Sequence, residues 1–184
     1  MTDEKKEPWL NYLALTTVIL AVCATLATFK GGGSSTRSVL NQSHAANQWA
    51  YYQSKSIKGY IHEAQKDNLE FGLKSSVNLS KRERNEYLKK VKEYQQEMKR
   101  YDEEKAQIQK DAKKYEALQL DSQKHAQVFG IAVIFLQIAI LLSSIAALLK
   151  KKPVWVMGLV LGSVGLVYFA SGFLMFLPDY LLLF

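Results

Sequence analysis

Three long apolar stretches constrain this chain more than any other feature of its sequence. They run from Trp9 to Phe29, from Val128 to Leu149 and from Val154 to Leu177, and none contains Asp, Glu, Lys or Arg. Each is about as long as the ~20 residues that a helix needs to cross a bilayer. Because hydrocarbon satisfies no backbone polar group, such segments span membranes as helices. The sequence therefore predicts an integral membrane protein with three transmembrane helices.

A polar insertion, residues 30–127, separates the first apolar stretch from the second. It holds 19 of the 24 basic and 13 of the 17 acidic side chains of the 184-residue chain, so most of the charge lies outside the expected lipid region. With three segments committed to lipid, a chain of this length leaves no room for a conventional catalytic domain beside the insertion. The composition therefore predicts a non-enzymatic membrane bundle that carries a stalk.

The first half of the insertion has the spacing of a helix, about residues 35–74. A thin apolar stripe recurs there at intervals of mostly three, four or seven residues. Its members are Val39, Ala46, Ala50, Ile57, Ala64 and Phe71. Gly31, Gly32 and Gly33 come before this helix, and three consecutive glycines favour a helix end and a swivel. We therefore expect the first transmembrane helix to end near residue 29.

The second half predicts a helix over residues 80–127 that continues into the second apolar stretch. Ser80 and Glu83 have the spacing of a capping box. The seam that follows mostly alternates three and four residues apart, as in a coiled coil. It consists of Tyr87, Val91, Tyr94, Met98, Tyr101, Ile108, Ala112 and Tyr115. With a turn over residues 72–79, the predicted fold is all-α, with an antiparallel coiled-coil hairpin outside the membrane.

The tyrosines of this seam allow two interpretations, because a buried phenol needs a hydrogen-bond partner. The seam is either wide and partly hydrated, as between hairpins of neighbouring subunits, or its hydroxyls reach polar groups such as Gln42 and Gln53. We favour packing within the chain over any ligand-binding role.

Small residues in the third apolar stretch predict close helix packing. Gly158 and Gly162 have the GxxxG spacing, and Gly165 lies on the same side. Gln137 is the strongly polar side chain deep in an apolar stretch, so we expect its amide to hydrogen bond to another helix. These four residues are the predicted packing contacts within the membrane.

The short connection over residues 150–153 predicts the orientation. Lys150, Lys151 and Lys152 mark a cytoplasmic loop that contacts lipid headgroups, and Pro153 suits the first turn of a helix. The N-terminal tail, residues 1–8, shares that side. The insertion and the C-terminal tail, residues 178–184, then lie outside, which means the periplasm in a Gram-negative cell.

A run within the insertion carries a family resemblance. Residues 44–58, HAANQWAYYQSKSIK, follow an apolar helix and a glycine-rich break. This resembles the signature of a bacterial membrane protein family known only as a domain of unknown function. The family has one span before a helical insertion and two after it, so the resemblance covers essentially the whole chain and implies a bacterial inner-membrane location. It implies no catalytic residue; the candidates for an interaction motif are Asn47, Gln48, Trp49, Tyr52, Gln53 and Lys55.

The sequence offers little chemistry. The three histidines are scattered, Cys23 lies inside an apolar stretch, and no nucleotide-binding or hydrolase motif is present, so we expect no metal, no cofactor and no enzymatic activity. Acidic and basic residues are interleaved along residues 80–124, which argues against nucleic acid. The expected partners are membrane lipids, further copies of the chain and a larger membrane complex.

Three functions stay open at this point. We favour a self-associating scaffold or accessory subunit, because the long stalk is excess material for a simple channel. The second is a subunit of an oligomeric channel or transporter. Its pore would be lined by Thr16, Thr17, Gln137, Ser143, Ser144 and Ser163. The third is a transmembrane sensor, which the glycine swivel favours and the lack of a recognisable output domain disfavours.

Overall fold

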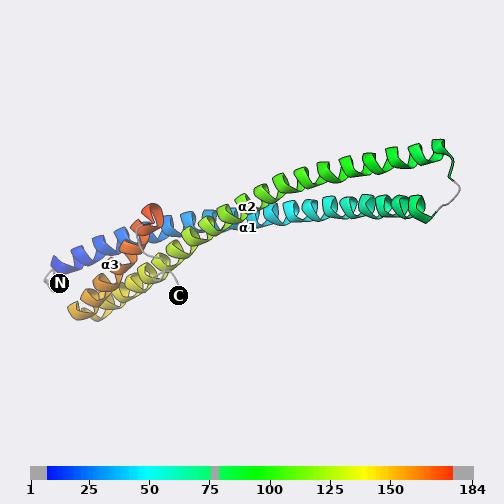
Figure 1. Cartoon of the computed structure of the whole chain (residues 1–184). Helices are drawn as coiled ribbons and strands as arrows, with labels where there is room; N and C mark the ends of the chain where they lie inside the picture. The colour runs from blue at the N-terminus through cyan, green and yellow to red at the C-terminus, as the bar shows by residue number, and fades with distance from the viewer. Residues whose placement is uncertain (1–7, 76–78, 176–184) are drawn as a thin grey trace. The chain divides into compact units, whose positions relative to one another are not determined.

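The computed structural model describes residues 8–75 and 79–175. Over these ranges it contains three α-helices and no strand: α1 (Pro8–Ser75), α2 (Lys81–Leu149) and α3 (Lys152–Leu174) (Figure 1). Each helix includes a segment that is long and apolar enough to cross a membrane. The all-α fold class is therefore confirmed. The centre of the predicted turn, residues 76–78, and nearly all of both predicted tails lie outside the described residues.

The chain divides into two compact units. The first, which we call the apolar unit, comprises Met1–Val39 and Gln119–Phe184, and the second, the polar unit, comprises Leu40–Leu118. The apolar unit therefore contains all three candidate membrane segments, whereas the polar unit contains the predicted seam and the family-like motif.

The predicted helix end at the three glycines is wrong, because α1 continues without a break through Gly31, Gly32 and Gly33. None of them has a positive φ, which a left-handed helix cap would require. Gly31 serves close packing instead: a Cβ built there would lie 3.0 Å from the Cβ of Phe129 on α2. The helix expected to begin near residue 35 is the continuation of α1.

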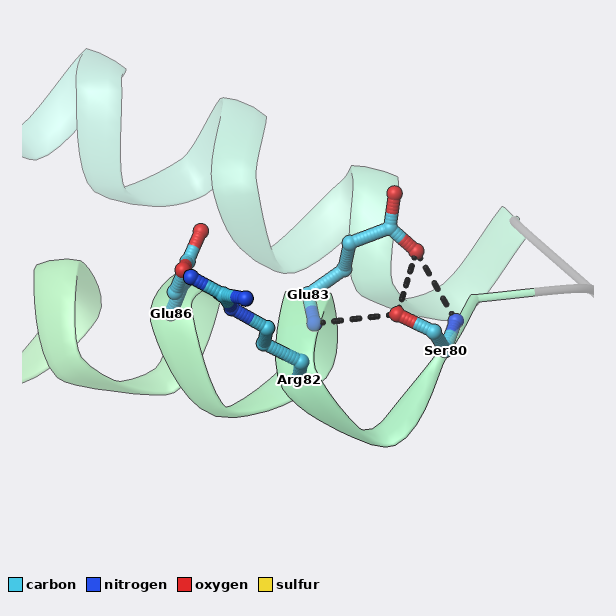
Figure 2. Close-up of polar contacts among 4 residues, drawn as sticks. All are labelled: Ser80, Arg82, Glu83 and Glu86. Carbon is cyan, nitrogen blue, oxygen red and sulfur yellow. Dashed lines mark hydrogen bonds and ion pairs between the residues drawn. The ribbon is translucent and has the colours of Figure 1, made fainter.

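The start of α2 has the predicted capping box (Figure 2). The Glu83 N–H donates to Ser80 Oγ at 3.2 Å, and the Ser80 N–H and hydroxyl donate to Glu83 Oε2 at 2.9 and 2.7 Å. These hydrogen bonds lower the pKa of the Glu83 carboxyl. Reciprocal bonding satisfies amides that a helix start leaves without partners, so α2 begins at Lys81.

The core of the apolar unit is built mainly from small residues on α2. Ala132, Ala139, Ser143 and Ala146 are fully buried there, together with Leu136. Leu20 and Ala24 of α1 pack against Leu136 and Ala139, and Trp9 and Leu13 of α1 pack against Ala146. Small side chains let the three helix backbones approach closely, which is how helices associate where lipid is as apolar as the core.

Candidate functional site

Within the polar unit, α1 and α2 contact each other in reversed sequence order. The His44 ring stacks on Tyr115 with centroids 5.1 Å apart, and the His62 ring stacks on Tyr101 at 5.7 Å. Further along α1, a Cβ built on Gly72 would lie 3.5 Å from the Tyr87 ring. Residues with higher numbers on α1 therefore contact residues with lower numbers on α2, so the two helices run in opposite directions in this unit.

The predicted seam of α2 faces these contacts. Four of its residues, Val91, Tyr101, Ile108 and Ala112, are buried. The other four are half-buried: Tyr87, Tyr94, Met98 and Tyr115. Since His44, His62 and Gly72 of the same chain pack on the seam tyrosines, the seam is occupied within one chain.

The face that α1 turns toward α2 is not its apolar stripe. The less exposed positions of α1 in this unit include Ala45, Tyr52, Lys55, Gly59, His62 and Lys66. By contrast, Ile57, Ile61 and Phe71 are 52%, 50% and 72% exposed, and Ala46, Ala50 and Ala64 are exposed as well. We call these six residues the outer stripe. The sequence pattern located most of it but could not show that it points away from α2.

An ion pair holds the middle of the polar unit. Lys55 Nζ lies 2.5 Å from Glu104 Oε2 and 5.3 Å from the centroids of both the Tyr51 and Tyr101 rings. The hydrogen bond between the two groups raises the pKa of Lys55 and lowers that of the Glu104 carboxyl. Arg100 Nε lies 3.5 Å from the other Glu104 oxygen. The carboxylate is therefore held in its charged form between two cations.

The structure divides the six motif candidates between two roles. Trp49 Nε1 donates to Glu116 Oε1 at 2.8 Å, and the Trp49 ring meets Tyr52 edge-on at 5.6 Å. Trp49 and Lys55 therefore tie α1 to α2, while Tyr52 packs against Trp49 on α1 itself. Asn47 and Gln53 are exposed, and Gln48 is half-buried. Part of the motif thus packs between the helices, and part of it is exposed. Gln53 lies between Ala50 and Ile57, on the same exposed face of α1 as the outer stripe.

The predicted glycine contacts of α3 are present in the apolar unit. Gly158, Gly162 and Gly165 are buried. A Cβ on Gly158 would lie 3.2 Å from the Ala139 carbonyl oxygen, one on Gly162 would lie 3.1 Å from Leu20, and one on Gly165 would lie 2.9 Å from Leu136. The GxxxG spacing is therefore used for packing within one chain, against both α1 and α2.

Gln137 does not share in this packing, and within the described residues its amide makes no hydrogen bond. Its predicted hydrogen bond to another helix therefore stays a prediction. Its side chain is exposed, whereas Leu136 and Ala139 beside it face the core. The sequence shows that Gln137 lies within an apolar segment, but it does not show which side of the helix faces the other helices of the chain.

The lysine connection lies beside a cluster of tryptophans. Lys150, Lys151 and Lys152 are exposed, and Lys152 Nζ lies 5.9 Å from the Trp9 ring. Trp9 and Trp155 have centroids 6.0 Å apart, and Trp155 Nε1 donates to Thr16 Oγ1 at 3.3 Å. Tryptophan with lysine is typical of the membrane–water boundary. Sequence analysis missed this cluster, although Trp9 is the first residue of one apolar stretch and Trp155 the second residue of another.

A second contact that sequence analysis missed ties α2 to the end of α3. His125 Nδ1 lies 2.9 Å from the Gly172 carbonyl oxygen. A Cβ on Gly172 would lie only 2.5 Å from the Phe129 ring, and Phe129 also packs edge-on against Phe169 and Phe173. The spacing of His125 and Gly172 in the sequence gives no sign of this contact, because it depends on how the helices pack.

Over residues 8–75 and 79–175, these features define an all-helical protein with three helices that are each long and apolar enough to cross a membrane. A family model described as Domain of unknown function (DUF4337) matches residues 9–175. The chain therefore belongs to the DUF4337 family. No curated protein and no solved structure matches it.

Proposed function

We propose that this protein is a self-associating scaffold or accessory subunit of the bacterial inner membrane. It would act by bringing further copies, and through them a larger membrane complex, together around its polar unit. In this proposal the protein catalyses no reaction. Its role is to position the surfaces through which other proteins bind.

The proposal includes a topology. Three helices cross the membrane, and α1 and α2 pair in the polar unit as an antiparallel coiled-coil hairpin outside it. The reversed order of the contacts from His44–Tyr115 to Gly72–Tyr87 supports the hairpin. The Trp9–Trp155 pair beside the lysine connection supports a membrane boundary at that end. The lysines would then be cytoplasmic and the hairpin periplasmic.

The observation that carries the proposal is the outer stripe. Ile57, Ile61 and Phe71 are at least half exposed on a helix whose other side already contacts α2. An apolar stripe at helical spacing is the face that a helix normally buries, and a contiguous exposed one marks an interaction surface. A second copy presents the same stripe, so two polar units can cover each other by symmetric packing.

The outer stripe can be tested by placing charge on it. The double variant Ile57→Glu, Ile61→Glu puts two carboxylates where apolar contact is proposed, so we expect the full-length protein in lipid nanodiscs to lose most of its multimeric population. The matched control, Ala106→Glu, Ala117→Glu, adds the same charges at exposed sites on α2 and should leave the mass distribution unchanged. Equal behaviour of the two variants would contradict the proposal.

A channel subunit is the second candidate, and one observation favours it. Gln137 and Ser144 lie seven residues apart and are both exposed on α2, so neighbouring copies could place them around a shared axis. Ser143, by contrast, is fully buried and donates to the Ala139 carbonyl at 2.9 Å, which removes it from any such lining. Rapid modification of a Ser144→Cys variant by a charged, water-soluble thiol reagent would support the channel over the scaffold.

A further inference from the structure

The outward face of α2 in the apolar unit repeats every seven residues. Gly130, Gln137 and Ser144 form one set, and Ile134, Leu141 and Leu148 form the other, so that the two sets alternate four and three residues apart. All six are exposed. This is the spacing with which two helices wrap around each other in a long parallel contact. The opposite side of α2, with Leu136 and Ala139, is already buried within the chain.

Gln137 distinguishes this face from the other exposed surfaces of the apolar unit. It lies near the middle of the apolar stretch, and within the described residues its amide makes no hydrogen bond. Three hydroxyl groups exposed on the same unit behave differently: Thr25 donates to the Ala21 carbonyl, Ser144 to that of Ile140 and Ser163 to that of Val160. An amide that met only hydrocarbon would lose its bonds to water without replacement.

We propose that this face binds α2 of a second copy, with the two Gln137 amides hydrogen bonded to each other. Copies inserted in the same direction place Gln137 at the same depth, and a carboxamide both donates and accepts, so the contact is self-complementary about a two-fold axis. Gly130 favours close approach, because a Cβ built there meets nothing within 4 Å. This inference rests on the proposed self-association and adds a surface within the membrane.

Relocating the amide tests the proposal in lipid vesicles, with energy transfer between labelled full-length copies as the measurement. Gln137→Leu should weaken association roughly tenfold, since hydrogen bonds between membrane helices are modest in strength. Gln137→Leu with Leu141→Gln returns an amide to the same face one turn away and should restore most of the association. Gln137→Leu with Val160→Gln, which places it on the exposed side of α3, should not.

Disulfide crosslinking locates the contact independently. In a Cys23→Ala background, Ser144→Cys should form a dimer on mild oxidation, whereas Ser163→Cys on α3 should not. If copies associate but the Gln137 variants and the Ser144→Cys crosslink show no effect, this inference is overturned while the proposed function stands. If the unmodified protein is a monomer in vesicles, both are overturned.

Discussion

Lys55 on α1 and Glu104 on α2 form an ion pair, with Nζ 2.5 Å from Oε2, on the side of α1 that faces away from its apolar stripe. The pair shows how this helix is oriented in the polar unit. Polar and small side chains of α1 meet the tyrosine seam of α2, and the aliphatic side chains of α1 point outward. Several consequences of this orientation can be measured.

Acid should weaken the contact between α1 and α2. The hydrogen bond from Lys55 lowers the pKa of Glu104 in the folded chain, so its stabilising effect is complete above the unfolded-state pKa and is lost as pH falls through the folded one. The raised pKa of Lys55 preserves the pair through neutral pH and loses it only in strong base. Between pH 7 and pH 3, thermal unfolding of the polar unit, followed by circular dichroism, should move to lower temperature.

Glu104→Gln is the control for that measurement. It removes the titrating carboxylate of the ion pair and should flatten the acid dependence, leaving the contribution of Glu83, whose pKa is also lowered. An unchanged pH profile in this variant would show that the ion pair does not contribute.

Charge placed in the tyrosine seam should disrupt the polar unit itself. Tyr101 is 8% exposed and lies beneath His62 and Lys55, so Tyr101→Lys removes a buried ring and brings a third cation near Lys55 and Arg100. Losses of this kind cost about 3 kcal/mol. Amide hydrogen exchange across residues 40–118 should accelerate strongly, whereas Leu88→Lys, at a position that is 45% exposed, should change it little. Intact protection with altered oligomer size would instead place the seam between subunits.

Alanine should be tolerated at two of the three consecutive glycines and resisted at the third. Gly32 and Gly33 have open space around a built Cβ, whereas Gly31 meets Phe129 at 3.0 Å. Gly32→Ala with Gly33→Ala should therefore stabilise α1 by about 1 kcal/mol per residue, the usual helix preference of alanine, and slow amide exchange there. Faster amide exchange in this variant would contradict the continuous helix and would support the flexible break that the sequence predicted at these glycines.

The close packing of α3 predicts that larger side chains at its buried glycines destabilise the apolar unit. A side chain at Gly165 would push on Leu136, and one at Gly172 would push on the Phe129 ring. Overpacking of this kind costs about 1–3 kcal/mol, so Gly165→Val should unfold more readily in denaturing detergent. Gly33→Val, at an exposed position of α1 where a built Cβ meets nothing within 4 Å, is the comparison, and equal sensitivity of the two would argue against the described packing.

Local patterns predicted much of this fold because they depend on neighbours in the sequence. The apolar stretches, the Ser80–Glu83 cap and the seam of α2 follow from composition and helical period. What the sequence could not give depends on other helices. The continuity of α1 through Gly31, the outward side of Gln137 and the contact between His125 and Gly172 are set by packing, and the ion pair at Lys55 turns the stripe of α1 outward.

The most direct test of the account is the copy number of the full-length protein released from lipid nanodiscs, measured by native mass spectrometry. Self-association through the outer stripe predicts particles with two or more chains over a range of protein-to-nanodisc ratios. Particles that hold one chain at every ratio, with no second protein bound, would contradict it.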